Sequence, residues 1–157
     1  MTRSKLVYLF FVIFWAGLVT GVSLFAAPIK FLVPGLSREL ELKLGSLTFG
    51  YFNYIEWSVC ILILLTLFWL IAKKQLQSPK LMTILSVFLA LILVMDSFYL
   101  LPELHSYVRD LASGEASIAT AADIAPYHRL YVIGDFTKLF LQLALFGIVV
   151  IKENIEA

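Results

Sequence analysis

The sequence predicts an all-α integral membrane protein whose four spanning helices form an antiparallel bundle. Three observations support this fold class: the apolar composition, four long apolar runs, and the distribution of basic residues among the segments that connect them. Of the 157 residues, 61% are hydrophobic and 15% are charged, whereas soluble domains average about 45–50% apolar and about 25% charged residues. The mean hydropathy is +0.94. The length fits a single four-helix transmembrane domain over residues 1–157.

Four segments are long enough to cross a bilayer, which requires about 20 mostly apolar residues. They are residues 6–27, 51–72, 81–101 and 131–151. The first follows two basic residues, as the core of a signal peptide does. Its apolar run exceeds the roughly 7–15 residues of such a core, so we interpret it as the first spanning helix.

Basic residues predict the orientation of the chain, because Lys and Arg accumulate in short cytoplasmic segments. Very short segments on one side of the predicted membrane hold Arg3, Lys5, Lys73, Lys74, Lys80 and Lys152. The longer loops 28–50 and 102–130 hold Lys30, Arg38, Lys43, Arg109 and Arg129, which are spread over many more residues. We therefore expect cytoplasmic termini and two outward-facing loops.

Both outward loops contain helical periodicity. One starts at Ser37, a candidate N-cap, and places Leu36, Leu40, Leu44 and Leu47 on one face. This helix could continue into the second span, although Gly45 and Gly50 weaken the join. The other follows Pro102, with Leu104, Tyr107, Val108 and Leu111 on one face. Both patterns predict short amphipathic helices at the outer membrane interface.

Serine and proline residues indicate where the helices are expected to begin or end. Ser78 and Pro79 are typical of an N-cap and the first helical position, and so begin the third span. Pro102 either ends that span or begins the next short helix. Pro126 is expected at the first position of the fourth helix, after a surface loop over 113–125.

The fourth apolar run carries a polar stripe. His128, Tyr131, Asp135, Lys138 and Gln142 follow one another at spacings of three, four, three and four residues. That spacing places them on one face of a helix. Ionisable residues inside a spanning segment are costly, so we expect this face to point into the bundle and to mark a candidate site.

Two further acids match the depth of this stripe. Glu56 lies five residues in from Tyr51, Asp96 lies five residues before Leu101, and Asp135 lies six residues beyond Arg129. At about 1.5 Å per residue, all three carboxylates are expected about 7–9 Å below the outer surface. Lys138 lies one turn deeper and requires a counter-ion. Three acids against one lysine leave up to two excess negative charges, which a proton, a cation or water would have to meet.

Neutral side chains near these depths extend the candidate site. Asn53, Tyr99 and Tyr131 are expected as hydrogen-bond partners, although aromatic belt positions explain the tyrosines equally well. Gln142 fits either the site or a simple contact between helices. A buried pair of Asp135 and Lys138 can also serve only to fix helix register.

Other chemistries find little support in the sequence. No extended basic patch or nucleic-acid-binding motif is present, and the lone Cys60 excludes an internal disulfide. No P-loop, zinc-protease motif or nucleophile motif occurs. His128 and His105 are the candidate ligands for a metal or haem, but no further pattern implies a cofactor.

Several stretches together resemble a family of small bacterial four-span inner-membrane proteins of uncharacterised function, distantly similar to the eukaryotic transmembrane protein 205 group. The residues that carry the resemblance are 27–31 with Pro34, Thr48-Phe49, Glu56-Trp57, Asp96, 99–102, His128, Tyr131 and Lys138. Members of that family usually have Glu where this chain has Asp135. The resemblance implies a four-helix membrane bundle in the bacterial inner membrane and a shared polar site, but no established activity.

Three hypotheses about function stay open at this point. The first is a protein that binds or conducts a cation or proton at the outer-leaflet cluster. The second is a structural or accessory subunit that binds a membrane partner or another copy of itself. The third is a membrane enzyme that uses paired carboxylates or a His-bound cofactor, which the sequence favours least.

Overall fold

The computed structural model describes residues 1–113 and 118–154, and these residues form helices and short connections without a strand. The α-helices are α1 (Arg3–Val19), α2 (Ala27–Ile29), α3 (Arg38–Ala72), α4 (Pro79–Met95), α5 (Leu101–Ser113) and α6 (Ile118–Asn154). A π-helical segment, Thr20–Ala26, joins α1 to α2, and a second one, Asp96–Leu100, joins α4 to α5. A 3₁₀ turn, Lys30–Leu32, follows α2.

Four continuous helical stretches are long and apolar enough to cross a membrane. They are Arg3–Ile29, Glu39–Ala72, Pro79–Leu111 and Ile124–Lys152. Each contains one of the four spans expected from the sequence, so the prediction of an all-helical chain with four helices long and apolar enough to span a membrane is confirmed for the described residues.

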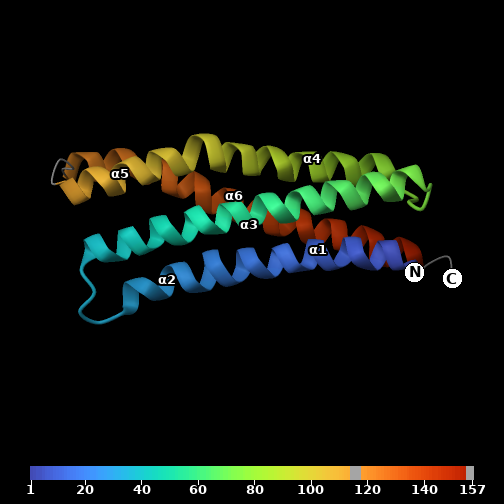
Figure 1. The fold of residues 1–157 in the computed structure, drawn as a ribbon, viewed down its shortest axis with the longest axis horizontal. Helices are drawn as coiled ribbons and strands as arrows, with labels where there is room; N and C mark the ends of the chain where they lie inside the picture. The colour runs from blue at the N-terminus through green and yellow to red at the C-terminus, as the bar shows by residue number, and fades with distance from the viewer. Residues whose placement is uncertain (114–117, 155–157) are drawn as a thin grey trace.

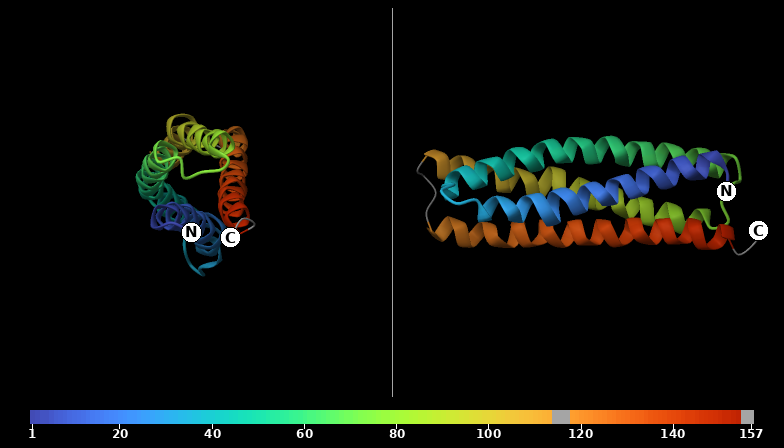
Figure 2. Two further views of the ribbon diagram at one scale, coloured as in Figure 1. Left: turned by 90° about the vertical axis from the view of Figure 1, so that its right-hand side faces the viewer. Right: turned by 90° about the horizontal axis from the view of Figure 1, so that it is seen from below.

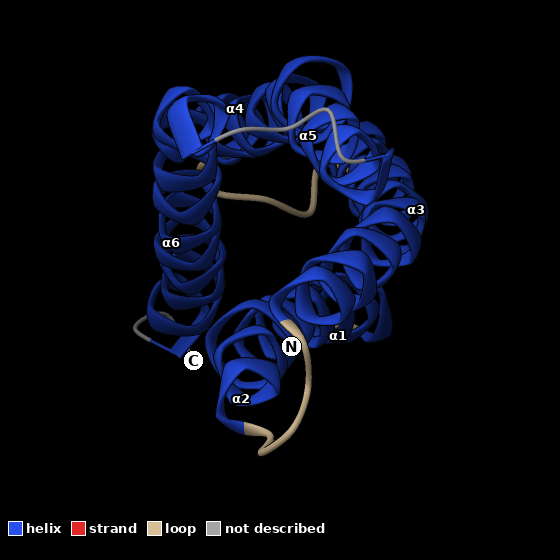
Figure 3. Cartoon of the chain, turned by 90° about the vertical axis from the view of Figure 1, so that its left-hand side faces the viewer, coloured by secondary structure: helices blue, strands red, loops and turns tan. Residues whose placement is uncertain are grey.

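The four stretches lie side by side around one core. Helix α1 packs against α3 and α6, and α4 packs against the same two helices on the other side (Figures 2 and 3). Helix α1 begins, and α6 ends, at the same end of the molecule (Figure 1). At that end Lys152 of α6 hydrogen-bonds to Ser78, and Thr2 bonds to Gln75. The basic segments that the orientation argument grouped together are therefore neighbours in space.

Apolar side chains cover both the inside and the outside of these helices. The core is formed by closely packed residues that include Tyr8, Val12, Trp15, Ile63, Leu70, Met82, Leu89, Leu93, Leu145 and Val149. On the outside, large apolar side chains such as Phe68 (71% exposed) and Phe140 (69% exposed) face away from the bundle. A helix that is apolar on every side suits hydrocarbon on its outer face and protein on its inner face.

The two expected amphipathic segments have different outcomes: the one after Pro102 lies in the 13-residue helix α5, whereas the one after Ser37 is not a separate short helix. The Ser37 hydroxyl accepts a hydrogen bond from the Leu40 amide, as expected of an N-cap, but α3 then runs unbroken from Arg38 to Ala72. With 35 residues it is about 50 Å long, whereas the hydrocarbon core is about 30 Å thick. Helix α3 therefore extends beyond the hydrocarbon, because its own backbone hydrogen bonds outweigh the weakening by Gly45 and Gly50.

The helix start expected at Pro126 is wrong, whereas the start expected at Pro79 is confirmed. Pro126 lies inside α6, and residues 118–125, expected as loop, are helical; residues 114–117 of that expected loop lie outside the described chain. Ser78 precedes Pro79 at the start of α4, but its side chain makes no capping bond and instead accepts one from Lys152.

Pro28 and Pro102 each follow a π-helical segment that ends two residues earlier. A proline ring collides with the carbonyl four residues before it and removes a donor. A wider π turn gives the ring room, so the helix continues. Hydroxyls near the start of each segment bond to carbonyls four residues back: Thr20 to Ala16 at 2.8 Å and Ser97 to Leu93 at 2.6 Å. These bonds satisfy carbonyls in a medium without water.

Candidate functional site: a buried carboxylate–lysine cluster

The four ionisable residues singled out inside the spans meet at one point. The Lys138 ammonium of α6 lies 2.7 Å from Glu56 Oε1 of α3, 3.0 Å from Asp96 Oδ2 and 2.7 Å from Asp135 Oδ1. Relative exposure is 0% for Glu56, Asp96 and Lys138 and 2% for Asp135. We call these four residues the charge cluster. The depth matching made from the sequence thus brought together residues that are in direct contact.

Hydrogen bonding within the charge cluster is uneven. Glu56 Oε1 accepts from Lys138 at 2.7 Å and from the Trp15 indole of α1 at 2.9 Å. By contrast, Glu56 Oε2 and both oxygens of Asp96 and of Asp135 lack a well-directed hydrogen bond among the described residues, although Lys138 approaches both aspartates closely. The arrangement therefore has buried acceptor capacity that one ammonium does not fill.

Two backbone features hold Asp96 in this position. It is the first residue of the π-helical segment Asp96–Leu100, whose wider turn changes the direction of the side chains that follow α4. On the facing helix, Gly134 lies so close that a Cβ there would be 3.2 Å from Asp96 Oδ1 and 3.4 Å from Ile92 Cγ2. The absence of a side chain at Gly134 thus lets α6 approach Asp96.

A second polar network lies beside the charge cluster. The Asn53 amide and the Trp57 indole donate to the Ser97 hydroxyl at 2.9 and 2.8 Å. Ser97 directly follows Asp96, so this network fixes the α3–α4 contact next to the cluster. Asn53 is therefore a neighbour of the site, and no contact with a cluster residue is seen for it among the described interactions.

Two other residues expected in the site, Tyr99 and Gln142, differ in exposure. Tyr99 is 54% exposed and packs against Tyr127, with 5.7 Å between ring centroids, which fits the aromatic-belt alternative and not a place in the polar network. The π-helical segment turns it outward. Gln142 is fully buried one turn deeper than Lys138, and its amide atoms have no hydrogen-bond partner among the described residues.

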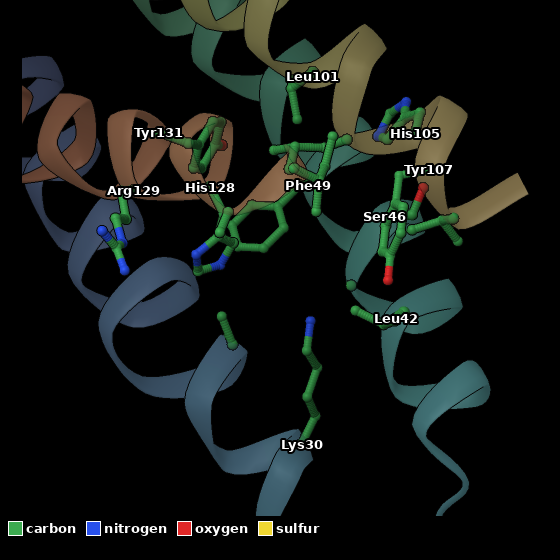
Figure 4. Close-up of a pocket in the computed structure, with 16 residues that line it drawn as sticks. Lys30, Leu42, Ser46, Phe49, Leu101, His105, Tyr107, His128, Arg129 and Tyr131 are labelled. Carbon is green, nitrogen blue, oxygen red and sulfur yellow. The ribbon is translucent and has the colours of Figure 1, made fainter. Parts of the chain in front are cut away.

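Tyr131 separates the charge cluster from a pocket at the end of the bundle opposite the chain termini, which we call the outer end after the orientation predicted from the sequence. The pocket has a volume of about 400 Å³ and lies between the end of α2, α3, α5 and α6 (Figure 4). Tyr131 lines it and is 2% exposed, and its ring centroid is 5.7 Å from Lys138 Nζ on the other side. The Phe49 ring packs edge-on against Tyr131 at 5.1 Å. His128 lies in the pocket wall, in line with its expected place at the mouth of the site.

The two histidines proposed as metal ligands, His128 and His105, line the same pocket. Within residues 1–113 and 118–154, however, no group of three or more His, Cys, Asp or Glu side chains is arranged to hold a metal ion. At the charge cluster the reason is visible in the geometry, since the Lys138 ammonium lies where the three carboxylates converge.

Sequence reasoning missed Trp15, Ser97 and Gly134. Trp15 had a detectable signal: with Tyr8, Val12 and Val19 it forms a helical face that is wholly buried, and an indole in that face needs an acceptor. Gly134 had none, because its role depends on which helix faces it.

No protein-family model, curated protein or solved structure matches this chain, so the functional argument rests on this geometry.

Proposed function

We propose that this protein is a four-pass membrane protein, an antiparallel bundle with both termini in the cytoplasm, that binds and exchanges a proton or cation at the charge cluster. The observation that carries the proposal is the charge balance. Three carboxylates from α3, the π-helical segment and α6 surround one ammonium, and all are at most 2% exposed. If every group is ionised, the excess is two negative charges, and a buried excess charge is very costly.

A proton suits this site better than a metal ion. The Lys138 ammonium already occupies the point that the carboxylates share, within 3.0 Å of all three. A proton needs no coordination sphere and turns a carboxylate oxygen into a donor. Protonating Asp96 or Asp135 would remove one negative charge and supply a hydrogen to a crowded group of acceptors.

Access to the cluster is best supported from the outer side. There the pocket approaches the cluster to within one aromatic ring, Tyr131. On the other side of Gln142, the core continues with the fully buried Leu145 and with Val149. We therefore propose exchange through the pocket, with the Tyr131 hydroxyl and His128 as relay groups.

The decisive experiment is proton flux into liposomes that contain the purified full-length chain and a pH-sensitive dye. We expect wild-type liposomes to dissipate an imposed pH gradient faster than empty ones, and Asp96→Asn to reduce the rate to that of empty liposomes. Asp110→Asn is the matched control, because Asp110 lies on α5 outside the cluster with a 40% exposed side chain. Wild-type flux equal to that of empty liposomes would reject conduction.

Proton binding can be measured apart from flux. Infrared difference spectra should show a carbonyl band of a protonated carboxylic acid that is lost in Asp96→Asn or Glu56→Gln. A wild-type spectrum without such a band would mean that all three carboxylates are ionised, and the excess charge would then require a bound cation.

A structural or accessory role is the second candidate, and the position of the cluster favours it. Trp15, Glu56, Asp96 and Lys138 connect α1, α3, the segment after α4, and α6 through one set of contacts. Such a network fixes helix register. In this case Asp96→Asn would lower thermal stability or co-purification of a partner, with no flux to lose.

An enzyme or haem protein is the third candidate, based on the shared pocket of His105 and His128. An absorption spectrum of the purified protein tests the haem hypothesis, because a Soret band would make haem binding the best supported of the three candidate functions. The similarity to bacterial four-span inner-membrane proteins and the inner-membrane location remain predictions.

A further inference from the structure

The outer pocket has a second property that proton exchange does not require: its ionisable wall groups are basic. Lys30, Arg129, His105 and His128 line it, and none of the described lining residues is an Asp or Glu. The rest of the wall is largely apolar, formed by Ala27, Leu42, Phe49, Leu101, Leu104, Val108, Ile124 and Ala125. A basic group of side chains beside an apolar wall is suited to a molecule with an anionic head and a hydrocarbon part.

Lys30 is placed to face this pocket. It directly follows the end of the first spanning stretch and points toward Phe49, with its ammonium 5.6 Å from the ring centroid (Figure 4). Its side chain lies against Gly45 of α3 so closely that a Cβ there would collide with the Lys30 ammonium. Gly45 thus allows a cation to reach into the space between α2 and α3.

Two residues that line this pocket each carry a buried polar atom without a hydrogen-bond partner in the described part of the chain. The Tyr131 hydroxyl and His105 Nε2 have no hydrogen-bond partner among the described residues. Tyr131 is 2% exposed, and both side chains line the pocket. Each can donate to an oxygen atom, the histidine in the tautomer that carries its proton on Nε2. Orphan donors of this kind indicate an acceptor that binds between them.

We propose that the outer pocket binds the phosphate head group of an anionic phospholipid, with its hydrocarbon along the apolar wall. Lys30 and Arg129 supply the charge, and Tyr131 and His105 donate to the phosphate oxygens. A volume of about 400 Å³ accommodates a head group and the first part of its chains. The remaining hydrocarbon stays in the bilayer that surrounds the spanning helices. Basic pockets between spanning helices bind lipid head groups by the same chemistry.

Native mass spectrometry of the full-length protein in detergent micelles tests this proposal. The probes are phosphatidylglycerol and phosphatidylcholine with identical acyl chains, titrated separately. We expect phosphatidylglycerol to bind at least about tenfold more tightly, and Lys30→Gln with Arg129→Gln to abolish that preference. The matched control is Arg109→Gln, because Arg109 lies on α5 with a 79% exposed side chain and does not line the pocket.

Three outcomes would overturn the proposal. Equal affinity of the wild type for the two lipids would exclude recognition of the anionic head. An equal loss in Arg109→Gln would show general surface attraction. Protection of the wild type against thermal unfolding by inorganic phosphate alone, without retained lipid, would identify a site for free phosphate.

A folding defect can be separated from a binding defect. Arg129→Lys keeps the charge and should retain the preference for phosphatidylglycerol, whereas Gly45→Leu should fill the pocket and remove the preference while all basic groups stay. Circular dichroism of each variant checks that the helices are intact. If Gly45→Leu folds and retains the preference, the lipid binds elsewhere and the proposal is wrong. Both proposals use the outer pocket and Tyr131, but lipid retention is measured without proton flux and none of these variants changes a residue of the charge cluster, so the two can fail separately.

Discussion

The two halves of helix α6 differ in what they place inside the bundle. The outer half turns Tyr131, Asp135, Lys138 and Gln142 inward, whereas the inner half turns Leu145 and Val149 inward, and all are nearly or fully buried. The apolar half gains stability from close packing without a need for partners. The polar half requires matched charges and hydrogen bonds, and several of its atoms lack them. Between Gln142 and Leu145, the buried face of α6 thus changes from polar and charged side chains to apolar ones.

Lys138→Met is expected to have the largest effect on the outer half. Removing the ammonium leaves three buried carboxylates without their common partner, which costs about 3–5 kcal/mol when a buried pair is broken. The loss should shrink as the pH falls, because protons can then neutralise the carboxylates in the folded protein. Thermal unfolding in detergent at neutral and acidic pH measures both effects. A loss that does not change with pH would contradict the view that the acids need a positive charge.

Leu145→Ala makes the equivalent test in the inner half. Leu145 is 0% exposed and belongs to the main hydrophobic core, so its truncation should cost about 2–5 kcal/mol of unfolding free energy. This loss should be the same at both pH values, and liposome flux should stay at the wild-type level. A change in flux would show that the inner half takes part in conduction, and the contrast between the halves would fail.

The sequence predicted the charge cluster better than its surroundings. Depth counting works for Glu56, Asp96 and Asp135 because a membrane fixes the height of each helix, and a costly charge has few places to go. The sequence could not decide between the two alternatives for Tyr99, since a π-helical turn changes the direction of a side chain in a way that helical periodicity cannot anticipate. The helix start predicted at Pro126 was wrong, because α6 already begins at Ile118 and continues past the proline.

The outer pocket was the least predictable part of the site. The pocket arises from α5 packing on α3 and α6, which depends on long helices that continue beyond the hydrocarbon. Periodicity indicated amphipathic helices there but not whether they lie flat or extend the spans. Lys30 and Gly45 meet across two elements that are joined only by the turn between α2 and α3, so no local pattern could relate them.

Gly134→Ala is expected to have the smallest effect, and it tests the contrast between the two halves of α6. The new methyl group would press on Asp96 Oδ1 at 3.2 Å and Ile92 Cγ2 at 3.4 Å; because the charge cluster holds Asp96 in place, we expect an overpacking cost of about 1–3 kcal/mol, reduced by the gain of up to about 1 kcal/mol from alanine in a helix. Gly147→Ala is the control in the inner half, because nothing lies within 4 Å of its added Cβ, and alanine stabilises a helix by up to about 1 kcal/mol over glycine.

The two alanines should therefore change stability in opposite directions, and only Gly134→Ala should alter the infrared band of the protonated acid, because it displaces Asp96 from Lys138. If Gly134→Ala is as stabilising as Gly147→Ala and leaves that band unchanged, the close approach of α6 to Asp96 does not constrain the cluster. The carboxylate would then be held by the π-helical turn alone.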